Sequence, residues 1–348
     1  MNERREKNAI SVIVPVKDGE RTIHACLESL ASQGMRPDEI IVVDNGSGDG
    51  TVTRVKEWAF AHPDLQVQLA FEIKAGPSAA RNRGAKGAKG RILAFLDADC
   101  IAPPDWLKSL STPMQEGSVA VGGPYREDPS LPAIEKYAAR SWFFGKQNPA
   151  ISFPNPFISR FLLGGNLALL RRHWEKIGGF DETLTTGEDL DLCFRLRREG
   201  VPMRLVFSAA VVHQTASSAS KRIRRAFRHG ILQSRLTERD FPRRLTLSLF
   251  EKSWQLPFPC AVAIEGASLT KCLGLLIVLG YFHALWAWFF LFALVLGWEM
   301  RMLFRMIRLG MPVHLKECLG IPLGWMVARF SMEIGRLVGS VRYRVLCW

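Results

Sequence analysis

The feature that most constrains the fold is an alternation of short apolar runs and helical patterns across residues 10–123. The runs at 10–16 and 40–43 are mostly β-branched or aliphatic, and each is followed within a few residues by Asp and Gly. Between them, residues 22–33 place apolar side chains at helical spacing. Strands that are apolar on both faces and separated by helices are typical of parallel sheets. The sequence therefore predicts an α/β domain with a mostly parallel sheet.

The same alternation continues along the chain. We expect further strands at 67–73, 92–96, 119–121, 204–207 and 210–213, and helices at 51–60, 78–87 and from residue 188 onward. Residues 124–160 hold six prolines and scattered aromatic residues, which fits a surface excursion or a flap that faces a substrate.

The charge of the chain favours an anionic partner. Lys and Arg outnumber Asp and Glu by 46 to 33, and residues 221–244 hold nine Lys or Arg against two acids. A nucleotide, an anionic membrane surface or a nucleic acid would suit this excess. We disfavour nucleic acid, because Phe227 is the only aromatic residue between 221 and 240 and base stacking is poorly served.

Cysteine usage and the amino terminus both indicate the cytosol. The seven cysteines are scattered and show no CxxC or Cys/His zinc spacing, which is typical of a reducing compartment. The first nine residues, MNERREKNA, are charged and lack the apolar core of a secretory signal. We expect the amino-terminal part to remain in the cytosol.

An apolar run at residues 273–298 contains no Asp, Glu, Lys or Arg and is long enough to cross a bilayer. A single crossing would put the three arginines of 301–308 on the far side, against the tendency of basic residues to stay in the cytosol. A re-entrant hairpin broken at Gly280, or a second pass within 318–330, avoids this. A buried helix of a soluble domain is the remaining interpretation.

Two acids follow the predicted strand 92–96, in the stretch ILAFLDADC. Asp97 and Asp99 lie two apart in an extended segment and therefore project to the same side. Carboxylates so placed repel each other unless a cation or a proton lies between them. Mg²⁺ or Mn²⁺ fits, because these ions take oxygen ligands and share their shell with phosphates. Solvated loop acids, or an Asp that caps the next turn, are the alternatives.

Two further side chains are expected near the same edge of the sheet. Asp44 ends the strand 40–43 and could accept hydrogen bonds from a ribose hydroxyl or a base imide, although Asp-Asn-Gly-Ser-Gly is also turn chemistry. Arg81 lies near the start of the helix 78–87, where a guanidinium could meet a phosphate or balance Asp97. A solvated arginine face is the alternative.

A second acidic cluster opens a helix in GGFDETLTTGEDLDLCFRLRREG. Glu188, Asp189 and Asp191 lie in its first turn, where acids interact favourably with the helix dipole. Three carboxylates in four residues exceed capping needs, so we expect one to act as a general base on an acceptor hydroxyl and another to orient it. His213 ends the strand 210–213 and is either a third metal ligand or a structural histidine.

In this order, the motifs resemble the family 2 glycosyltransferases of the GT-A fold. The resemblance covers about residues 11–213 and rests on the two acidic motifs together with SVIVPVKDGERTIHACLESLASQ, EIIVVDNGSGDGT, GPSAARNRG and LLGGNLALLRR. It implies an enzyme that transfers a sugar from a nucleotide-sugar donor to an acceptor hydroxyl by inverting single displacement, with Mg²⁺ or Mn²⁺ at the diphosphate. The Gln-x-x-Arg-Trp motif of processive synthases is not in the sequence, which favours addition of one sugar.

The resemblance also implies roles for particular residues. The nucleotide sugar would contact Pro15, Val16, Asp18, Asp44, Arg81, Asp97 and Ala98. The metal would be held by Asp99 and Asp97, with His213 as the candidate third ligand. Asp189 would be the catalytic base, with Glu188 and Asp191 beside it, and the acceptor-side loop would contain Gly165 and Asn166.

We therefore expect a GT-A catalytic domain at 1–220, a basic amphipathic interfacial segment at 221–256 and a hydrophobic, helical, membrane-associated region at 257–348. Such an enzyme would act at the cytosolic face of a bacterial inner membrane, against anionic lipid, on a glycan or lipid-linked acceptor. A polyprenyl-phosphate sugar transferase, whose acceptor is the lipid phosphate itself, is the alternative. A non-catalytic membrane protein is disfavoured because the acids are present.

Overall fold

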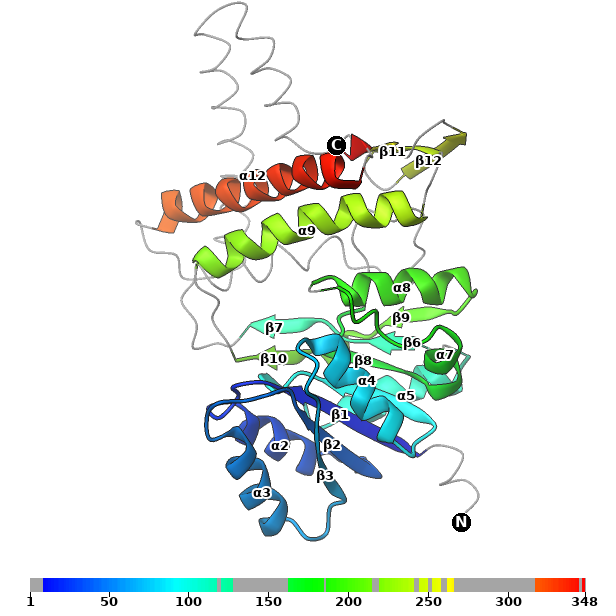
Figure 1. The fold of residues 1–348 in the computed structure, drawn as a ribbon. Helices are drawn as coiled ribbons and strands as arrows, with labels where there is room; N and C mark the ends of the chain where they lie inside the picture. Colours follow the sequence, from blue (N-terminus) through cyan, green and yellow to red (C-terminus); the bar gives the residue numbers. More distant parts are fainter. Residues whose placement is uncertain are drawn as a thin grey trace, which may run out of the picture. The chain divides into compact units, whose positions relative to one another are not determined.

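The structure, a computed structural model, describes residues 9–117, 120–127, 162–184, 186–214, 219–240, 244–249, 252–257, 262–265, 317–343 and 346–347. The chain divides into two units near residues 215 and 216. The first unit contains the elements from β1 to β10, and the second contains those from α9 to β14 (Figure 1).

A seven-stranded sheet forms the centre of the first unit, in the order β3-β2-β1-β4-β8-β6-β9 (Figure 1). Its strands are β1 (Ile10–Val16), β2 (Glu39–Asp44), β3 (Val67–Phe71), β4 (Ile92–Leu96), β6 (Ala120–Gly122), β8 (Asn166–Leu170) and β9 (Met203–Leu205). Neighbours pair in parallel except at β8, which is antiparallel to β4 and β6. The predicted α/β fold with a mostly parallel sheet is confirmed.

Helices cover both faces of this sheet because its inner strands are apolar on both faces. On one face, Val12 and Val14 of β1 share a core with α2 (Ile23–Ala31), α3 (Thr51–Ala61) and α5 (Trp106–Gln115). On the other face, Ile13 packs in a core that has contributions from α4 (Pro77–Gly87), α7 (Arg171–Lys176) and α8 (Glu188–Arg198). The first unit is therefore a three-layer α/β/α sandwich.

The strand order reverses direction at β1, because β2 and β3 extend the sheet to one side and β4 extends it to the other. Parallel-sheet proteins bind ligands beyond the carboxyl ends of the strands at such a point. Here those ends are the turn after Val16 of β1 and the acids after Leu96 of β4. The topology therefore marks this edge as the place for a site.

A second, three-stranded sheet begins directly after Asp97 and Asp99. Its order is β5 (Cys100–Ile101), β10 (Val211–His213) and β7 (Tyr125–Glu127), with β10 antiparallel to β5 and parallel to β7. The register sets His213 opposite Cys100 and Val211 beside Tyr125. This small sheet brings residues from two distant segments, β7 and β10, to the acids that follow β4.

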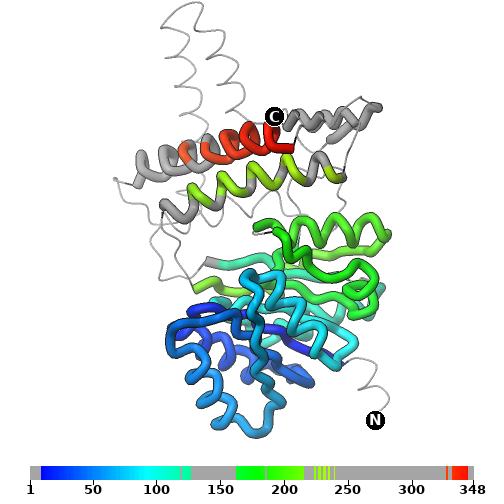
Figure 2. The backbone as a smooth tube through the Cα atoms, viewed as in Figure 1, coloured from blue at the N-terminus to red at the C-terminus, as the bar shows by residue number. Residues whose placement is uncertain are grey.

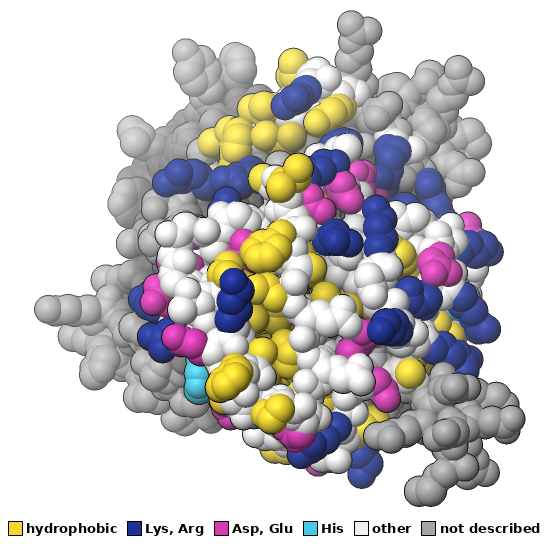
Figure 3. All heavy atoms as spheres, turned by 60° about the horizontal axis from the view of Figure 1, so that its bottom comes forward, with side chains coloured by type: hydrophobic (Ala, Val, Ile, Leu, Met, Phe, Trp, Pro, Cys, Tyr) yellow, Lys and Arg dark blue, Asp and Glu magenta, His cyan; other side chains and the backbone are white. Residues whose placement is uncertain are grey.

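Hydrophobic side chains also reach the surface of the first unit. Phe60 at the end of α3 is 90% exposed, and Phe71 and Ile73 at the edge strand β3 are 56% and 100% exposed. On the face drawn in Figure 3, such side chains lie among interspersed acidic and basic ones. Charge of one sign does not dominate the described part of this face.

The second unit contains α9 (Ala219–Asp240), α12 (Glu317–Tyr343) and a four-stranded sheet of β11 (Arg244–Leu249), β12 (Lys252–Pro257), β13 (Val262–Glu265) and β14 (Leu346–Cys347). The two helices lie side by side in Figures 1 and 2. Ser234 of α9 donates a hydrogen bond to the carbonyl of Arg336 at 3.0 Å, and a Cβ at Gly230 would collide with the backbone of α12. Small residues therefore allow the close approach of these helices.

The second unit differs from its predicted organisation. The basic segment is helical only as far as Asp240 and continues as β11 and β12, and strands β13 and β14 lie in the region expected to be helical. In Arg244–Leu249, leucine alternates with Thr and Ser, and such alternation favours a strand. A membrane crossing needs a helix that is both long and apolar, and none of the described helices meets both conditions. The apolar run 273–298 and most of 124–160 lie outside the described residues.

Candidate active site

Asp97 directly follows β4, and two neighbouring side chains hold its carboxylate. Nη2 of Arg81 lies 2.7 Å from Oδ1, and the Tyr125 hydroxyl donates to Oδ2 at 3.0 Å. Burial by itself would raise the pKa of Asp97, but the charge and hydrogen bond of Arg81 outweigh burial and lower that pKa. Arg81 therefore balances the charge of Asp97, which is one of the roles that the sequence suggested for this arginine.

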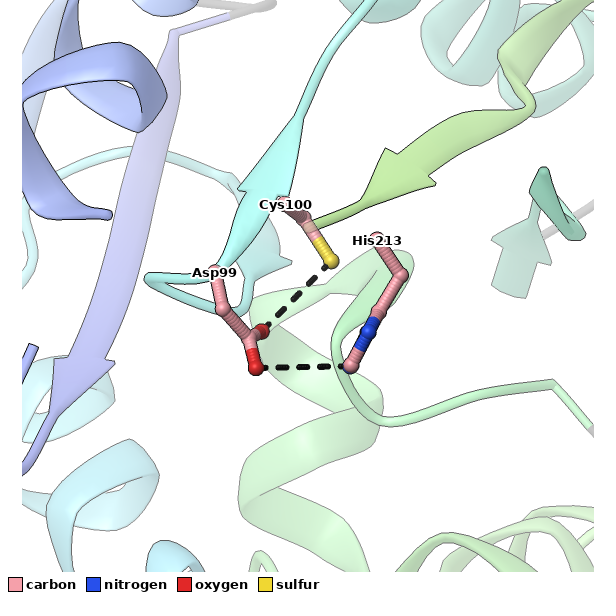
Figure 4. Close-up of side chains that lie close together, drawn as sticks. All are labelled: Asp99, Cys100 and His213. Atoms are coloured by element: carbon pink, nitrogen blue, oxygen red, sulfur yellow. Dashed lines mark hydrogen bonds and ion pairs between the residues drawn. The ribbon is translucent and has the colours of Figure 1, made fainter. Parts of the chain in front are cut away.

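Asp99 faces the small sheet instead. Nε2 of His213 lies 3.3 Å from Oδ2 of Asp99, and the Cys100 thiol lies 3.9 Å from Oδ1 (Figure 4). The ligand atoms of these three residues all lie within 4.8 Å of one another. The two acids of the DAD stretch therefore have different partners, although the sequence predicted that they project to the same side. The structure places His213 next to Asp99.

A divalent cation fits the oxygen and nitrogen atoms of Asp99 and His213. Both side chains keep about 30% exposure, so the remaining coordination positions would be open to water or phosphate. Burial, and then the charges of Asp97 and Asp99, raise the pKa of Cys100 well above its ordinary value. Cys100 therefore stays a neutral thiol, which is a poor ligand for Mg²⁺ or Mn²⁺.

The acidic helix α8 approaches the same site through Arg81. Nη1 of Arg81 lies 2.8 Å from Oε1 of Glu188, and the side chain of Arg81 is only 4% exposed. Gly187 is the N-cap residue before the helix and has φ 68°, a left-handed conformation that suits glycine. The acids of the first turn lie at the positive end of the helix dipole. One guanidinium therefore contacts an acid from each of the two predicted motifs.

Asp189 is the next residue on α8, and its pKa is raised to about 7. The largest cause is loss of contact with bulk water, followed by the neighbouring charge of Glu188. The backbone N–H groups of Leu190 and Gly164 and the charge of Arg81 act in the opposite direction. A carboxyl group with a pKa near neutrality can accept a proton at neutral pH.

The residues predicted to contact a nucleotide lie along the ends of β1, β2 and β4. Pro15 and Val16 pair with Val43 and Asp44 in the register of β1 and β2, and Ala98 is buried after β4. Asp44 is 5% exposed, and its Oδ2 accepts hydrogen bonds from the N–H groups of Gly46 and Ser47 at 3.2 and 3.3 Å. The turn chemistry that the sequence suggested is present at Asp44.

Asp18 is exposed and adopts φ 51°, the only positive φ of a non-glycine residue in the described ranges. Its Oδ1 accepts a hydrogen bond from the N–H of Gly48 at 2.8 Å, and its own N–H donates to Ser47 Oγ at 2.9 Å. Backbone strain of this kind is often found at functional sites. These contacts join the turn after β1 to the glycine-rich turn after β2.

Two predicted site residues have structural positions instead, which corrects their assignment. Asp191 is fully buried and its Oδ2 accepts from Arg195 at 2.6 and 2.9 Å, because the two residues lie one helical turn apart. Asn166 begins β8 rather than a loop, and it is fully buried, with Oδ1 accepting from Trp106 Nε1 and Nδ2 donating to two backbone carbonyls. Both side chains are fully buried in the first unit.

Gly165 is predicted on the acceptor side, but it lies against the DAD motif. Its carbonyl accepts from the N–H of Asp97 at 3.2 Å, and a Cβ at Gly165 would collide with the Asp97 carboxylate and the Tyr125 hydroxyl. Only glycine leaves room for this arrangement.

Tyr125 is a site residue that the sequence did not reveal. Its hydroxyl contacts Asp97, and its ring lies 5.2 Å from the His213 ring between centroids. It comes from the short strand β7 in a segment without a recognisable motif, and only the pairing of β7 with β10 brings it to the site.

The fold and the site define a glycosyltransferase-type domain of the GT-A fold, with paired acids after a central strand and a second acidic pair opposite. Residues 11–178 match Glycosyl transferase family 2, so the chain contains a family 2 glycosyltransferase domain. The family resemblance predicted from the motifs is thereby confirmed.

The chain is 30% identical over 207 residues to the pre-mycofactocin glycosyltransferase of Mycobacterium tuberculosis, a match that covers 59% of this chain and 42% of that protein. It is 28% identical over 224 residues to a validoxylamine A glucosyltransferase of Streptomyces hygroscopicus, covering 56% and 49%. The matches thus span less than half the length of these relatives. The mannosyltransferase PcManGT of Pyrobaculum calidifontis shares the fold with a TM-score of 0.55 and 19% identity, over 96% of this chain and 86% of that one.

Proposed function

We propose that the chain moves one sugar from a nucleotide-sugar donor to an acceptor hydroxyl with inversion at the sugar. The observation that carries this proposal is the convergence of two acidic motifs on one buried guanidinium, since Arg81 contacts both Asp97 and Glu188. This convergence supports a site with donor-binding acids on one side and a proton acceptor, Asp189, on the other. Two of the glycosyltransferases that match this chain, both from bacteria, are consistent with it.

The nucleotide would lie at the carboxyl ends of β1 and β2. Oδ1 of Asp44 is buried, and among the described residues no group hydrogen-bonds to it. Buried polar atoms in native proteins nearly always have a partner, so this atom fits a ribose hydroxyl or a base imide. Pro15, Val16 and the turn at Asp18 would line the same end, with Arg81, Asp97 and Ala98 nearer the diphosphate.

The metal would lie at Asp99, with His213 as its nitrogen ligand. The mannosyltransferase that shares this fold was studied in complex with GDP-mannose and Mn²⁺. A divalent cation, Mg²⁺ or Mn²⁺, would stabilise negative charge on the diphosphate leaving group. Because Asp97 is held by Arg81 and Tyr125, we assign it to positioning of the site and Asp99 to the direct metal contact.

Asp189 would act as the general base. Its carboxylate accepts the proton of the acceptor hydroxyl while that oxygen forms a bond to the anomeric carbon of the sugar. The bond between the anomeric carbon and the diphosphate oxygen breaks with its electron pair, and the configuration inverts. A pKa of about 7 supports this role, because a base works best when its pKa lies near the working pH.

We also propose that the enzyme works at an anionic membrane surface, on a lipid-linked glycan or lipid at the cytosolic face of a cell membrane. Arg224 and Arg228 of α9 are exposed, and α12 exposes Leu337 and Val341 at 59% and 83%. Each basic residue near an anionic surface contributes about 1 kcal/mol to binding. Cosedimentation of the full chain with phosphatidylglycerol vesicles but not with phosphatidylcholine vesicles would support this assignment, and equal partition would remove it.

The test of the catalytic proposal is a screen of UDP- and GDP-linked sugars for Mn²⁺-dependent binding and slow donor hydrolysis. We expect at least one donor to bind to the wild-type chain and to the Asp189→Asn variant alike, with hydrolysis only in the wild-type chain. Acceptors that end in a sugar hydroxyl and acceptors that end in polyprenyl phosphate then separate the two transfer reactions. The lack of binding of every donor would overturn the proposal.

A further inference from the structure

We propose that Arg81 is a positioning residue that joins the donor end of the site to the acceptor end, by holding Asp97 and Glu188 at fixed places next to Asp189. This inference rests on the proposed function for the assignment of Asp97 to the donor and of Asp189 to the acceptor. It differs from the role that the family resemblance implies for Arg81, which is a contact to the nucleotide sugar.

The geometry fixes the guanidinium at both ends. Nη2 lies 2.7 Å from Asp97 and Nη1 lies 2.8 Å from Glu188, and the side chain is 4% exposed. The two branches of a guanidinium are rigidly coplanar, so a shift at one carboxylate moves the other branch as well. The Phe180 ring lies 5.4 Å from the guanidinium carbon and restricts it from a third direction.

The backbone around Arg81 is also fitted to this bridge. A Cβ at Gly164 would come within 3.2 Å of Nη1 and 3.4 Å of the Cβ of Asp189. Gly164 therefore fills the space between the arginine and the proposed base with backbone alone, and its N–H also acts on the Asp189 carboxylate. Arg81, Gly164 and Asp189 therefore lie close together, and the ion pair with Arg81 joins Asp97 to them.

The bridge has an electrostatic consequence for Asp189. In the described part of the chain, the charged groups with the largest effect on the pKa of Asp189 are Glu188 from its own helix and Arg81 from α4. The charge of Asp189 in turn raises the pKa of Cys193, one turn further along α8. Glu188 raises the pKa of Asp189 and Arg81 lowers it. Removal of Arg81 would leave Glu188 and Asp189 as adjacent carboxylates without their shared counter-charge, so Asp189 would keep its proton to a higher pH.

The test is a carboxyl ¹³C NMR titration of the full chain, labelled at aspartate Cγ and without donor or metal. The resonance that disappears in Asp189→Asn identifies Asp189. We expect its titration midpoint near pH 7 in the wild-type chain, a rise of one unit or more in Arg81→Gln, and a fall in Glu188→Gln. The opposite signs follow from the opposite charges, and Glu188→Gln leaves the Arg81–Asp97 pair in place if Arg81→Gln does not fold.

Arg171→Gln is the matched control, because Arg171 is a half-buried arginine whose guanidinium donates to backbone carbonyls of Gly90, Ala85 and Ala88. Its loss should destabilise the fold without a change in the Asp189 midpoint. An unchanged midpoint in Arg81→Gln, or in Glu188→Gln, would overturn the positioning role. Because the titration uses no donor, this failure is distinct from a failure to bind nucleotide sugars.

Discussion

Nε2 of His213 lies 3.3 Å from Oδ2 of Asp99, although the two residues come from distant parts of the chain. The pairing of β10 with β5 produces this contact, since it sets His213 opposite Cys100, the residue that follows Asp99. A carboxylate and an imidazole with partial exposure leave coordination positions for other ligands. The proposed metal-binding role of His213 can therefore be tested without a sugar donor.

We expect His213→Ala and Asp99→Asn each to weaken Mn²⁺ binding by at least about tenfold, because loss of even an outer-sphere partner commonly has an effect of that size. The full chain is titrated with Mn²⁺, and the concentration of free Mn²⁺ at each step is measured by electron paramagnetic resonance.

Cys100→Ser is the matched control for the metal site. The thiol of Cys100 lies in the same cluster but stays protonated, so this variant should bind Mn²⁺ as the wild-type chain does. Equal Mn²⁺ affinity of His213→Ala and the wild-type chain would remove His213 from the metal site.

The rate of transfer should depend on pH through Asp189. Because this group must be deprotonated to accept a proton and its pKa is raised to about 7, kcat/KM should fall about tenfold per pH unit below pH 7 and level off above it. Asp189→Asn should lower kcat by a factor on the order of 10² to 10⁴ and leave donor affinity nearly unchanged. A profile that stays flat from pH 5 to 8, measured with a saturating donor, would contradict the base assignment.

Much of the first unit could be predicted from the sequence, because its strands are apolar on both faces and its helices have clear periodicity. The strand at Ile10–Val16 and the helix at Pro77–Gly87 lie within one residue of their expected positions. Strand β8 escaped prediction, although it lies between β4 and β6 in the sheet. Its five residues, NLALL, are equally compatible with a helix, and short apolar runs do not distinguish the two by periodicity.

The site was predictable where its chemistry lies in local motifs and not where it depends on tertiary pairing. The acids Asp97, Asp99 and Asp189 stand in recognisable stretches, whereas Tyr125 reaches Asp97 only through the β7–β10 pairing. Asp191 is the opposite case. Its place in the first turn of a helix suggested a catalytic role, whereas the structure pairs it with Arg195.

Asp189 should also make folding stability depend on pH. Its folded-state pKa of about 7 exceeds the value near 4 of an unfolded aspartate, so the folded chain holds an extra proton between these values. Stability contributed by this group is therefore lost as pH rises from about 4 to 7, by on the order of 2 to 4 kcal/mol. Asp189→Asn should remove this dependence and be the more stable form at pH 8, as measured by urea unfolding at both ends of the range.

An unchanged slope of stability against pH in Asp189→Asn would show that the carboxyl has an ordinary pKa. Asp181→Asn provides a comparison, because Asp181 lies in a partly exposed turn in which Thr183 donates to it at 2.7 and 2.9 Å. Its removal should leave the slope between pH 5 and 7 unaltered.

Asn166 should contribute to stability rather than to recognition of an acceptor. Asn166→Ala would leave three buried groups without their partner, namely Trp106 Nε1 and the carbonyls of Pro124 and Ala209. Each such group costs about 1 to 3 kcal/mol, so the free energy of unfolding should fall by about 3 kcal/mol or more. Trp106→Phe, which removes one of these hydrogen bonds together with its donor, should cost less. Donor binding and acceptor KM should stay near wild-type values at a temperature where Asn166→Ala remains folded. A raised acceptor KM with unchanged stability would instead return Asn166 to the acceptor side of the site.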